Sequence, residues 1–530
     1  MRLSGWVTRR SRNKSATGFC NIETFKRMKI SLPSPTPLNK RKECSCISSP
    51  LPKEGGLEKV NHSFSIFNFQ FLIILLVFLF SGCATWYQRT AEFQAAVNSG
   101  NFEKANKLLD KDKKQAMGKN RILYYLNKGY VEFMLGNPTN SNQYFETAEN
   151  LIDEYHSNVG TEAAALVTNP ETRPYRPEDF EIIMINFYKA LNYIDLNDME
   201  GALVEVRKIN IKLNQLNDKY PDNKNRYQRD AFAHLLMGLI YDATGDYNNA
   251  FIAYRNAYEV YQSDYIKNFG VKAPEQLKQD LMRTAYICGF SAELKQYEKE
   301  FNTTYTHTPT PADGQLVFFW LNGMGPVKAE WSINFAKQKR GDGAIVFHNE
   351  SLGLTFPFFF GSGYSDDEKR SIADLQTLRV AFPKYMERPP LYATGTLVTG
   401  NHSYPLELAE NINEIAFKTL RDRMVREFSN SLLRVAAKKG LEYSARKQNE
   451  WLGFAVSIAN SLTEKADTRN WQTLPYSISY TRLPLSAGTN NLTLRLNARN
   501  GSQHTEQFSI EGGGRKTRFH VFQTMDSKQK

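Results

Sequence analysis

The 530-residue chain contains 67 Lys and Arg residues against 55 Asp and Glu residues, a formal net charge of +12, and 41% of its residues are hydrophobic. Residues 1–82 hold 13 of the basic and 4 of the acidic residues, which leaves 54 basic and 51 acidic residues in the rest of the chain. That near balance gives no support to nucleic-acid binding. The length allows two or three domains with packed cores.

The first predicted element is a signal sequence. Phe71–Phe80 is an unbroken apolar run, too short to span a bilayer, and it is followed by Ser81-Gly82-Cys83. The pattern resembles the lipobox of bacterial lipoproteins. This resemblance implies that residues 1–82 are removed and that Cys83 carries fatty acyl chains such as palmitate. Because Phe80 is bulky for a lipobox, an uncleaved single-pass anchor is the alternative.

The same resemblance predicts a location. Ala84 follows Cys83, where many Gram-negative bacteria use an acidic residue to retain a lipoprotein at the inner membrane. We therefore expect a protein of the bacterial cell envelope that is lipid-anchored at the outer membrane and faces the periplasm. After processing, Cys83 and Cys288 are the remaining cysteines, and lipid occupies the first, so no intramolecular disulfide is expected.

Residues from Thr90 to about Glu298 show helical periodicity. The clearest segment contains Gly238, Gly245-Asp246, Ala250 and Tyr254 and resembles a tetratricopeptide repeat, in which small residues let two antiparallel helices approach closely. Inter-helix turns are predicted in four places: Gly100-Asn101, Gly136-Asn137, Asn197-Asp198 and Gly245-Asp246. Their spacing exceeds the ~34 residues of an ideal array, so insertions are expected.

The longest insertion covers roughly residues 156–180 and is rich in proline, which excludes regular helix. It contains Tyr175, Arg176 and Glu178. Tyr and Arg are the residue types that most often anchor interfaces, and long loops in compact solenoids are usually functional or disordered. We therefore predict that these three residues bind a partner. The alternative is that the segment packs onto the groove, with the Tyr175 ring in the core.

A linker is predicted at residues 305–313. Beyond it, the spacing of apolar residues changes from a period of about 3.6 residues, typical of helices, to a period of 2, typical of strands. Seven segments beyond it are predicted as strands: Leu316–Leu321, Gly343–His348, Thr377–Phe382, Tyr392–Thr399, Tyr476–Tyr480, Leu492–Leu496 and Thr517–Phe522. A helical insertion is expected at about residues 409–465. The predicted fold is multidomain α + β, with a tetratricopeptide-like α-solenoid at residues 84–304 and a β-sandwich-like α+β domain at residues 314–525.

The sequence contains no local catalytic motif. Its eight histidines have no His, Cys or carboxylate neighbour at metal-ligand spacing, and it has neither a phosphate-binding glycine loop nor a serine-hydrolase motif. No cofactor and no metal are predicted. Glu178, Asp179, Glu181 and Glu205 are candidate carboxylates for glycoside hydrolysis, which requires two acids about 5–10 Å apart.

Several segments together resemble an uncharacterised family of bacterial tetratricopeptide-repeat-containing envelope lipoproteins. The segments include the repeat around Gly238 together with Tyr175–Glu181, Ala202–Arg207, Asn322–Lys328 and Thr468–Pro475. The resemblance implies an envelope lipoprotein with an adaptor role, and it supplies no catalytic residues.

We therefore expect a lipid-anchored periplasmic scaffold that binds a protein or peptide partner in its helical groove, since solenoid repeats present long, shallow grooves. It contacts the membrane through the lipid on Cys83. One alternative is an enzyme or enzyme activator that acts on cell-wall polymer. Another is a lipoprotein that handles lipid or polysaccharide through its β-rich domain.

Overall fold

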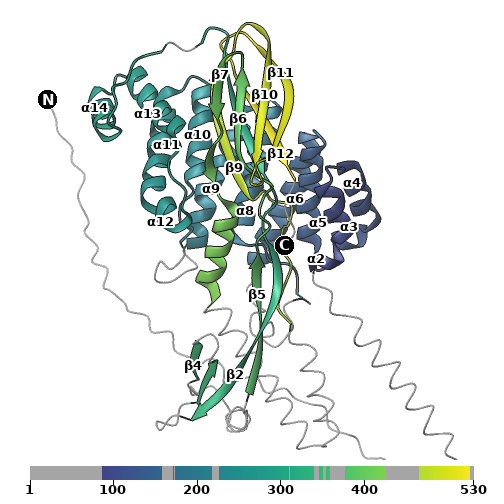
Figure 1. Ribbon diagram of the computed structural model, residues 1–530. Coiled ribbons are helices and arrows are strands. Elements are labelled where there is room, and N and C mark those ends of the chain that lie inside the picture. The colour runs from purple at the N-terminus through teal and green to yellow at the C-terminus, as the bar shows by residue number, and fades with distance from the viewer. Residues whose placement is uncertain are drawn as a thin grey trace, which may run out of the picture. The chain divides into compact units, whose positions relative to one another are not determined.

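The computed structural model describes residues 86–157, 171, 173–217, 226–308, 311–339, 345–349, 354–358, 377–424 and 465–525. The predicted lipidation site, Cys83, lies outside these residues, as do the apolar run before it and most of the predicted helical insertion. Helices occupy the described chain up to Glu300, and strands begin at Gln315 (Figure 1). The predicted order of a helical part followed by a β-rich part is confirmed.

Five antiparallel helix pairs form the helical part of the described chain. They are α3 (Ala91–Asn98) with α4 (Phe102–Lys111), α5 (Arg121–Met134) with α6 (Pro138–Ser157), α8 (Asp179–Asp195) with α9 (Met199–Asn217), α10 (Ala231–Ala243) with α11 (Tyr247–Val260), and α13 (Glu275–Ile287) with α14 (Ser291–Glu300). Shorter pieces are α2 (Trp86–Arg89), η2 (Lys113–Ala116), the π-helical turn η5 (Tyr261–Tyr265) and α12 (Ile266–Phe269).

The same turn joins the two helices of each pair. Gly100, Gly136, Asn197 and Gly245 have positive φ angles of 68°, 72°, 57° and 83°, which confirms the four predicted inter-helix turns. In each turn the next residue donates its N–H to a carbonyl five positions earlier, as Asp246 does to Tyr241 at 2.9 Å. This is the Schellman geometry that ends helices. A fifth such turn, at Gly289, was not predicted.

Gly238 lies where α10 and α11 approach each other, and a Cβ atom there would overlap the ring of Tyr254. We expect Gly238→Leu to overpack this contact and to lower the free energy of unfolding by about 1–3 kcal/mol. The volume-conserving change Met237→Leu in the same helix is the control. Thermal unfolding of both variants tests this, and equal melting temperatures would contradict the assigned contact.

The described strands form three four-stranded sheets. The first has the order β12 (Thr517–Thr524), β1 (Gln315–Asn322), β9 (Ser477–Pro484), β8 (Glu407–Glu410). The second has the order β11 (Gln503–Gly512), β10 (Gly488–Ala498), β6 (Tyr392–Thr399), β7 (His402–Pro405). The third has the order β4 (Leu354–Phe358), β3 (Ile345–Asn349), β2 (Val327–Lys339), β5 (Thr377–Met386). β1 and β12 are parallel, whereas the other pairs are antiparallel.

Each of the seven predicted strands overlaps a strand of the structure, whereas β2, β4, β7, β8 and β11 were missed. β8 corrects the start of the predicted helical insertion, because Glu407–Glu410 is extended and the helix covers residues 412–424 before the described residues end. A segment of four residues is too short to show the alternation of apolar and polar residues that marks a strand in a sequence. β8 is extended because it pairs with β9.

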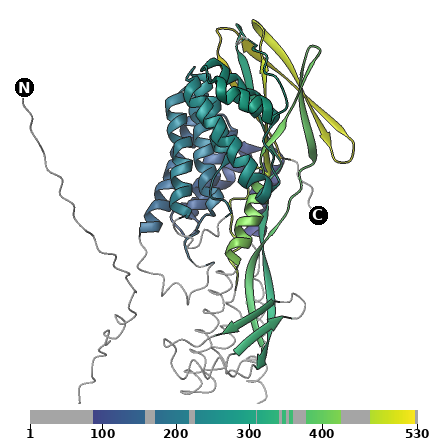
Figure 2. The same ribbon diagram turned by 90° about the vertical axis from the view of Figure 1, so that its left-hand side faces the viewer.

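Within the first sheet, β1 is buried on both faces. Leu316, Phe318 and Trp320 of β1 share a buried cluster with Leu492 and Leu494 of β10. The alternate residues Val317, Phe319 and Leu321 belong to the cluster formed with the helices. β1 therefore has an almost continuous apolar sequence, and its sheet lies between the helices and the second sheet (Figure 2).

Candidate functional site

The first helices of the three central pairs, α5, α8 and α10, face the β-rich part of the same chain. The Tyr130 hydroxyl lies 3.5 Å from the sulfur of Met525, the ring centroids of Tyr188 and Trp471 are 5.8 Å apart, and Phe232 meets Phe319 at 6.0 Å. This face of the repeats is therefore covered by the chain itself. It does not offer the open helical groove in which the sequence placed a partner.

Tyr175, the first of the predicted partner-binding residues, is 1% exposed. Its hydroxyl donates to Glu181, its backbone N–H donates to the Lys119 carbonyl at 2.7 Å, and its ring lies 5.6 Å from the guanidinium of Arg469. This burial favours the alternative in which the segment packs against the protein. Arg176, by contrast, is exposed.

Glu178 is buried at the N-terminus of α8 and pairs with two cations from the β-rich part. They are Lys328 of β2 and Arg423 of the helix at residues 412–424. Burial alone would raise the pKa of the Glu178 carboxyl, but the charges of Arg423 and Lys328 outweigh it and lower this pKa to about 2. The ion pairs link segments 150 and 245 positions apart in the sequence.

The pKa of Glu181, one helical turn later, is shifted in the opposite direction. Burial raises the pKa of its carboxyl to about 7, although Lys328, Tyr175 and the backbone of Glu178 oppose the effect. Its oxygens accept hydrogen bonds from the backbone N–H groups of Glu178 at 2.9 Å and Trp471 at 2.7 Å. Opposed pKa shifts can mark an acid–base pair. Here, however, the partners of both carboxylates come from the chain itself, and these contacts stabilise the junction between the helical part and the β-rich part.

The four candidate carboxylates are not brought together. Glu178 and Glu181 share the cluster at the start of α8, and Asp179 lies half-buried beside them. Glu205 belongs to a separate cluster on α9, in which Lys189 and Lys208 lie 3.1 and 3.0 Å from its carboxylate. Of the four candidates, the structure therefore brings together Glu178, Asp179 and Glu181 and leaves Glu205 apart.

Three of the segments that carry the family resemblance meet at this first cluster. Tyr175–Glu181 supplies the acids, Asn322–Lys328 supplies Lys328, and Thr468–Pro475 supplies Arg469 and Trp471. Backbone contacts also join the last two segments, because the Gly325 N–H donates to the Leu474 carbonyl at 2.7 Å. Their common role in the described structure is to join the helices to the strands.

A second buried charge cluster was missed by the sequence analysis. Arg482 of β9 donates from Nη1 to Asp242 at 2.6 Å and to Asp280 at 2.7 Å. Arg283 donates to the same two carboxylates, so the cluster holds two positive and two negative charges. Arg482 and Arg283 lower the pKa of Asp242 to about 2 against the effect of burial. Nothing local marks the two pairs of Arg482, because Arg482 is 240 positions from Asp242 and 202 positions from Asp280.

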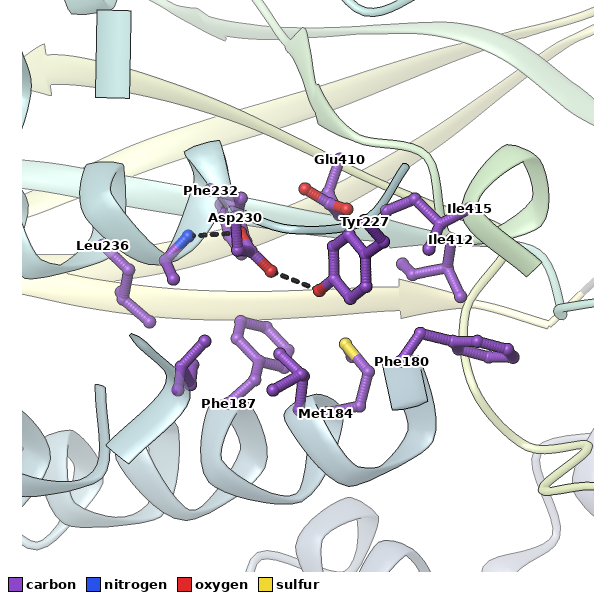
Figure 3. Close-up of a pocket in the computed structure, with 13 residues that line it drawn as sticks. Phe180, Met184, Phe187, Tyr227, Asp230, Phe232, Leu236, Glu410, Ile412 and Ile415 are labelled. Carbon is purple, nitrogen blue, oxygen red and sulfur yellow. Dashed lines mark hydrogen bonds between the residues drawn. The ribbon is translucent and has the colours of Figure 1, made fainter. Parts of the chain in front are cut away.

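Figure 3 shows a pocket between α8, α10 and the segment after β8, in which Asp230 and Glu410 face apolar side chains. Asp230 caps α10 by accepting the Ala233 N–H at 2.7 Å, and it accepts the Tyr227 hydroxyl at 2.6 Å. Burial raises the pKa of both carboxyls, and the nearby Asp230 charge adds to the shift of Glu410. The cavity volume is about 10 Å³, enough for one water molecule and not for a sugar ring.

Two larger grooves are open to solvent. The first, which we call the edge groove, has a volume of about 510 Å³ and lies between β12 and the turns of the pairs α5–α6 and α8–α9. The second, the linker groove, has a volume of about 750 Å³ and lies between α13, Thr303–Thr306 with Thr308 and Pro311, and β7 and β9. Both volumes are in the range of ligand-binding sites.

The described His, Cys, Asp and Glu side chains form no group that could hold a metal ion. No described helix has both the length and the apolar character needed to cross a membrane. Cys288 is a free, half-buried thiol.

No known protein-family model matches the chain, and no curated protein matches its sequence. Among solved structures, MamA is 15% identical, with 39% of this chain and 90% of that chain covered and a TM-score of 0.25. The apo form of RapI is 14% identical, with 40% and 68% covered and a TM-score of 0.28. Aspartyl phosphate phosphatase F from Bacillus subtilis is 13% identical, with 44% and 54% covered and a TM-score of 0.29. These likenesses are too weak to indicate a function.

Proposed function

We propose that this protein is a lipid-anchored scaffold of the bacterial cell envelope that binds a protein or peptide partner. The observation that carries the proposal is the edge groove, where repeat turns and the outer strand of a sheet form an open, partly apolar surface. The pocket with two protonatable carboxyls, by contrast, has room for one water molecule and no larger ligand. A protein with an open groove and a closed acidic pocket is better suited to binding than to catalysis.

The proposal includes three further features. They are lipidation of Cys83, removal of the residues before it, and a periplasmic location at the outer membrane. The β-sandwich-like arrangement of the first two sheets is supported by the buried cluster that β1 shares with β10. Partner binding by the Tyr175–Glu178 segment stays a prediction. Of its three predicted residues, Arg176 is the one exposed to a partner.

Replacing Cys83 with Ala is expected to abolish labelling by a fatty-acid analogue and to release the protein from membranes. Each buried CH₂ group contributes about 0.8 kcal/mol, so the loss of two or three acyl chains removes nearly all membrane affinity. Cys288→Ala is the matched control and should retain label and location. Tight membrane association of an unlabelled Cys83→Ala protein would show that another segment is the anchor.

Copurification after mild detergent extraction tests the scaffold function. A protein partner present in a stoichiometric amount supports it, provided that the partner also binds the purified chain. A bound glycan or lipid without any protein partner would overturn it in favour of the alternatives.

The linker groove favours one second candidate, the binding of polysaccharide. Its lining combines amide and hydroxyl side chains and two aromatic rings, Tyr305 and Tyr404, with charged side chains of α13, β8 and β9. Amide and hydroxyl groups match sugar hydroxyls in hydrogen bonding, and the faces of tyrosine rings offer apolar contact. Calorimetric titration with soluble cell-wall oligosaccharides tests this candidate, and a Tyr404→Ala variant should lose the binding.

A further inference from the structure

We propose that an extended segment of the partner protein binds in the edge groove as an additional strand along β12. This inference rests on the proposed function and names the class of partner. Addition of a strand needs an edge with unpaired backbone groups, and it needs space beside that edge for alternate side chains. β12 and the edge groove meet both requirements.

The backbone of β12 has one described neighbour, β1, and so presents its other side to the groove. Gln315 donates its N–H to the Lys516 carbonyl at 3.1 Å, and Gly323 donates to the Thr524 carbonyl at 2.9 Å. In a parallel pair with unbroken register, even-numbered residues of this strand therefore point their N–H and C=O groups toward β1. The odd-numbered residues, including Phe519 and Val521, point theirs outward.

The groove runs along this outward side. Consecutive residues of β12 from Thr517 to Val521, and then Gln523, line it. All of them are only partly buried. On the opposite wall the apolar side chains of Phe133, Leu191 and Met199 come from the repeat turns and the adjoining helices. An added strand would thus place alternate side chains against an apolar wall while its backbone pairs with β12.

The other edges of the first two sheets carry features that discourage strand addition. β8 has four residues and a shift of register against β9, and β7 has four residues and ends in Pro405. β11 is longer and carries Glu506 and Glu511. β12 has eight residues in unbroken register, without proline, and Arg518 is its one charged residue apart from His520. Its edge is the least protected of the four.

The test uses a displayed library of ten-residue linear peptides, selected on the full lipidated chain in detergent. We expect the enriched peptides to alternate apolar and polar residues and to bind the wild-type chain. Methylation of alternate backbone nitrogens in an enriched peptide should weaken binding at least tenfold in one register and little in the other. This measurement needs no variant of the protein.

Two variants at one position locate the site. Val521→Pro removes an outward N–H, which an edge strand tolerates, and should weaken peptide binding at least tenfold. Val521→Thr keeps the N–H and the branched shape and should bind like the wild type. Equal binding by both variants, with unchanged melting temperatures, would overturn strand addition at β12. That result would leave the scaffold proposal intact if a copurified partner still binds the chain. The scaffold proposal itself is contradicted by a different result, the absence of any copurified protein partner.

Discussion

Replacing Arg482 with Met is expected to lower the free energy of unfolding by about 3–5 kcal/mol, the cost of breaking a buried ion pair from one side. The change leaves Asp242 and Asp280, both buried, without the guanidinium that donates to them at 2.6 and 2.7 Å. Arg283 remains, but one positive charge then faces two negative ones. Chemical denaturation at neutral pH measures the effect.

Arg495→Met is the matched control, because Arg495 is an exposed arginine on the neighbouring β10 and its loss should change stability by less than about 0.5 kcal/mol. Adding Asp242→Asn to the Arg482 variant removes one uncompensated charge and should recover part of the loss. If Arg482→Met and Arg495→Met unfold at the same denaturant concentration, the charge cluster around Arg482 does not stabilise the contact between β9 and the helices.

Glu178→Gln is expected to lower the free energy of unfolding by a similar amount, about 3–5 kcal/mol, at pH 7, since it removes the carboxylate with which buried Lys328 and partly buried Arg423 form ion pairs. The effect depends on pH. The pKa of Glu178 is lowered from 4.5 to about 2 in the folded protein, so its stabilisation is complete above about pH 4.5 and is lost as the pH falls toward 2. The stability difference between wild type and variant should therefore vanish near pH 2.

Glu200→Gln provides the control, because Glu200 occupies the first turn of α9 but is exposed. Denaturation curves of the three proteins at several pH values between 2 and 7 make the comparison. A constant difference between wild type and Glu178→Gln across this range would show that the carboxylate is not held ionised by Lys328 and Arg423.

The turns of the repeats could be predicted because their signal is local. A left-handed residue after a helix favours Gly or Asn, and Gly100, Gly136, Asn197 and Gly245 stand where that backbone is required. Gly289 has the same geometry, but the helix that follows it, α14, is polar, with Tyr297 as its one buried residue, so its apolar signal is weak. The period of two likewise identified the strands with one buried face, such as β10, in which Leu492, Leu494 and Leu496 are buried.

The charge clusters could not be predicted, since the sequence does not tell which acid meets which base. Glu178 was recognised as a candidate for binding or catalysis, yet its role depends on Lys328 and Arg423, which only the tertiary fold brings to it. The same applies to the covered face of the repeats. Aromatic residues such as Tyr188 and Phe232 suit an interface, and the interface they form is with Trp471 and Phe319 of their own chain.

The parallel pairing of β1 with β12 has a consequence for how the chain acquires its structure. The two strands are 202 positions apart, and the backbone N–H of Trp86, in the first described helix, donates to Thr468, 382 positions later. Contacts of such long range form slowly, because a large loop must close before they are gained. Until β12 has been made, the apolar face of α5, α8 and α10 is uncovered, so the polypeptide needs protection from aggregation throughout its synthesis.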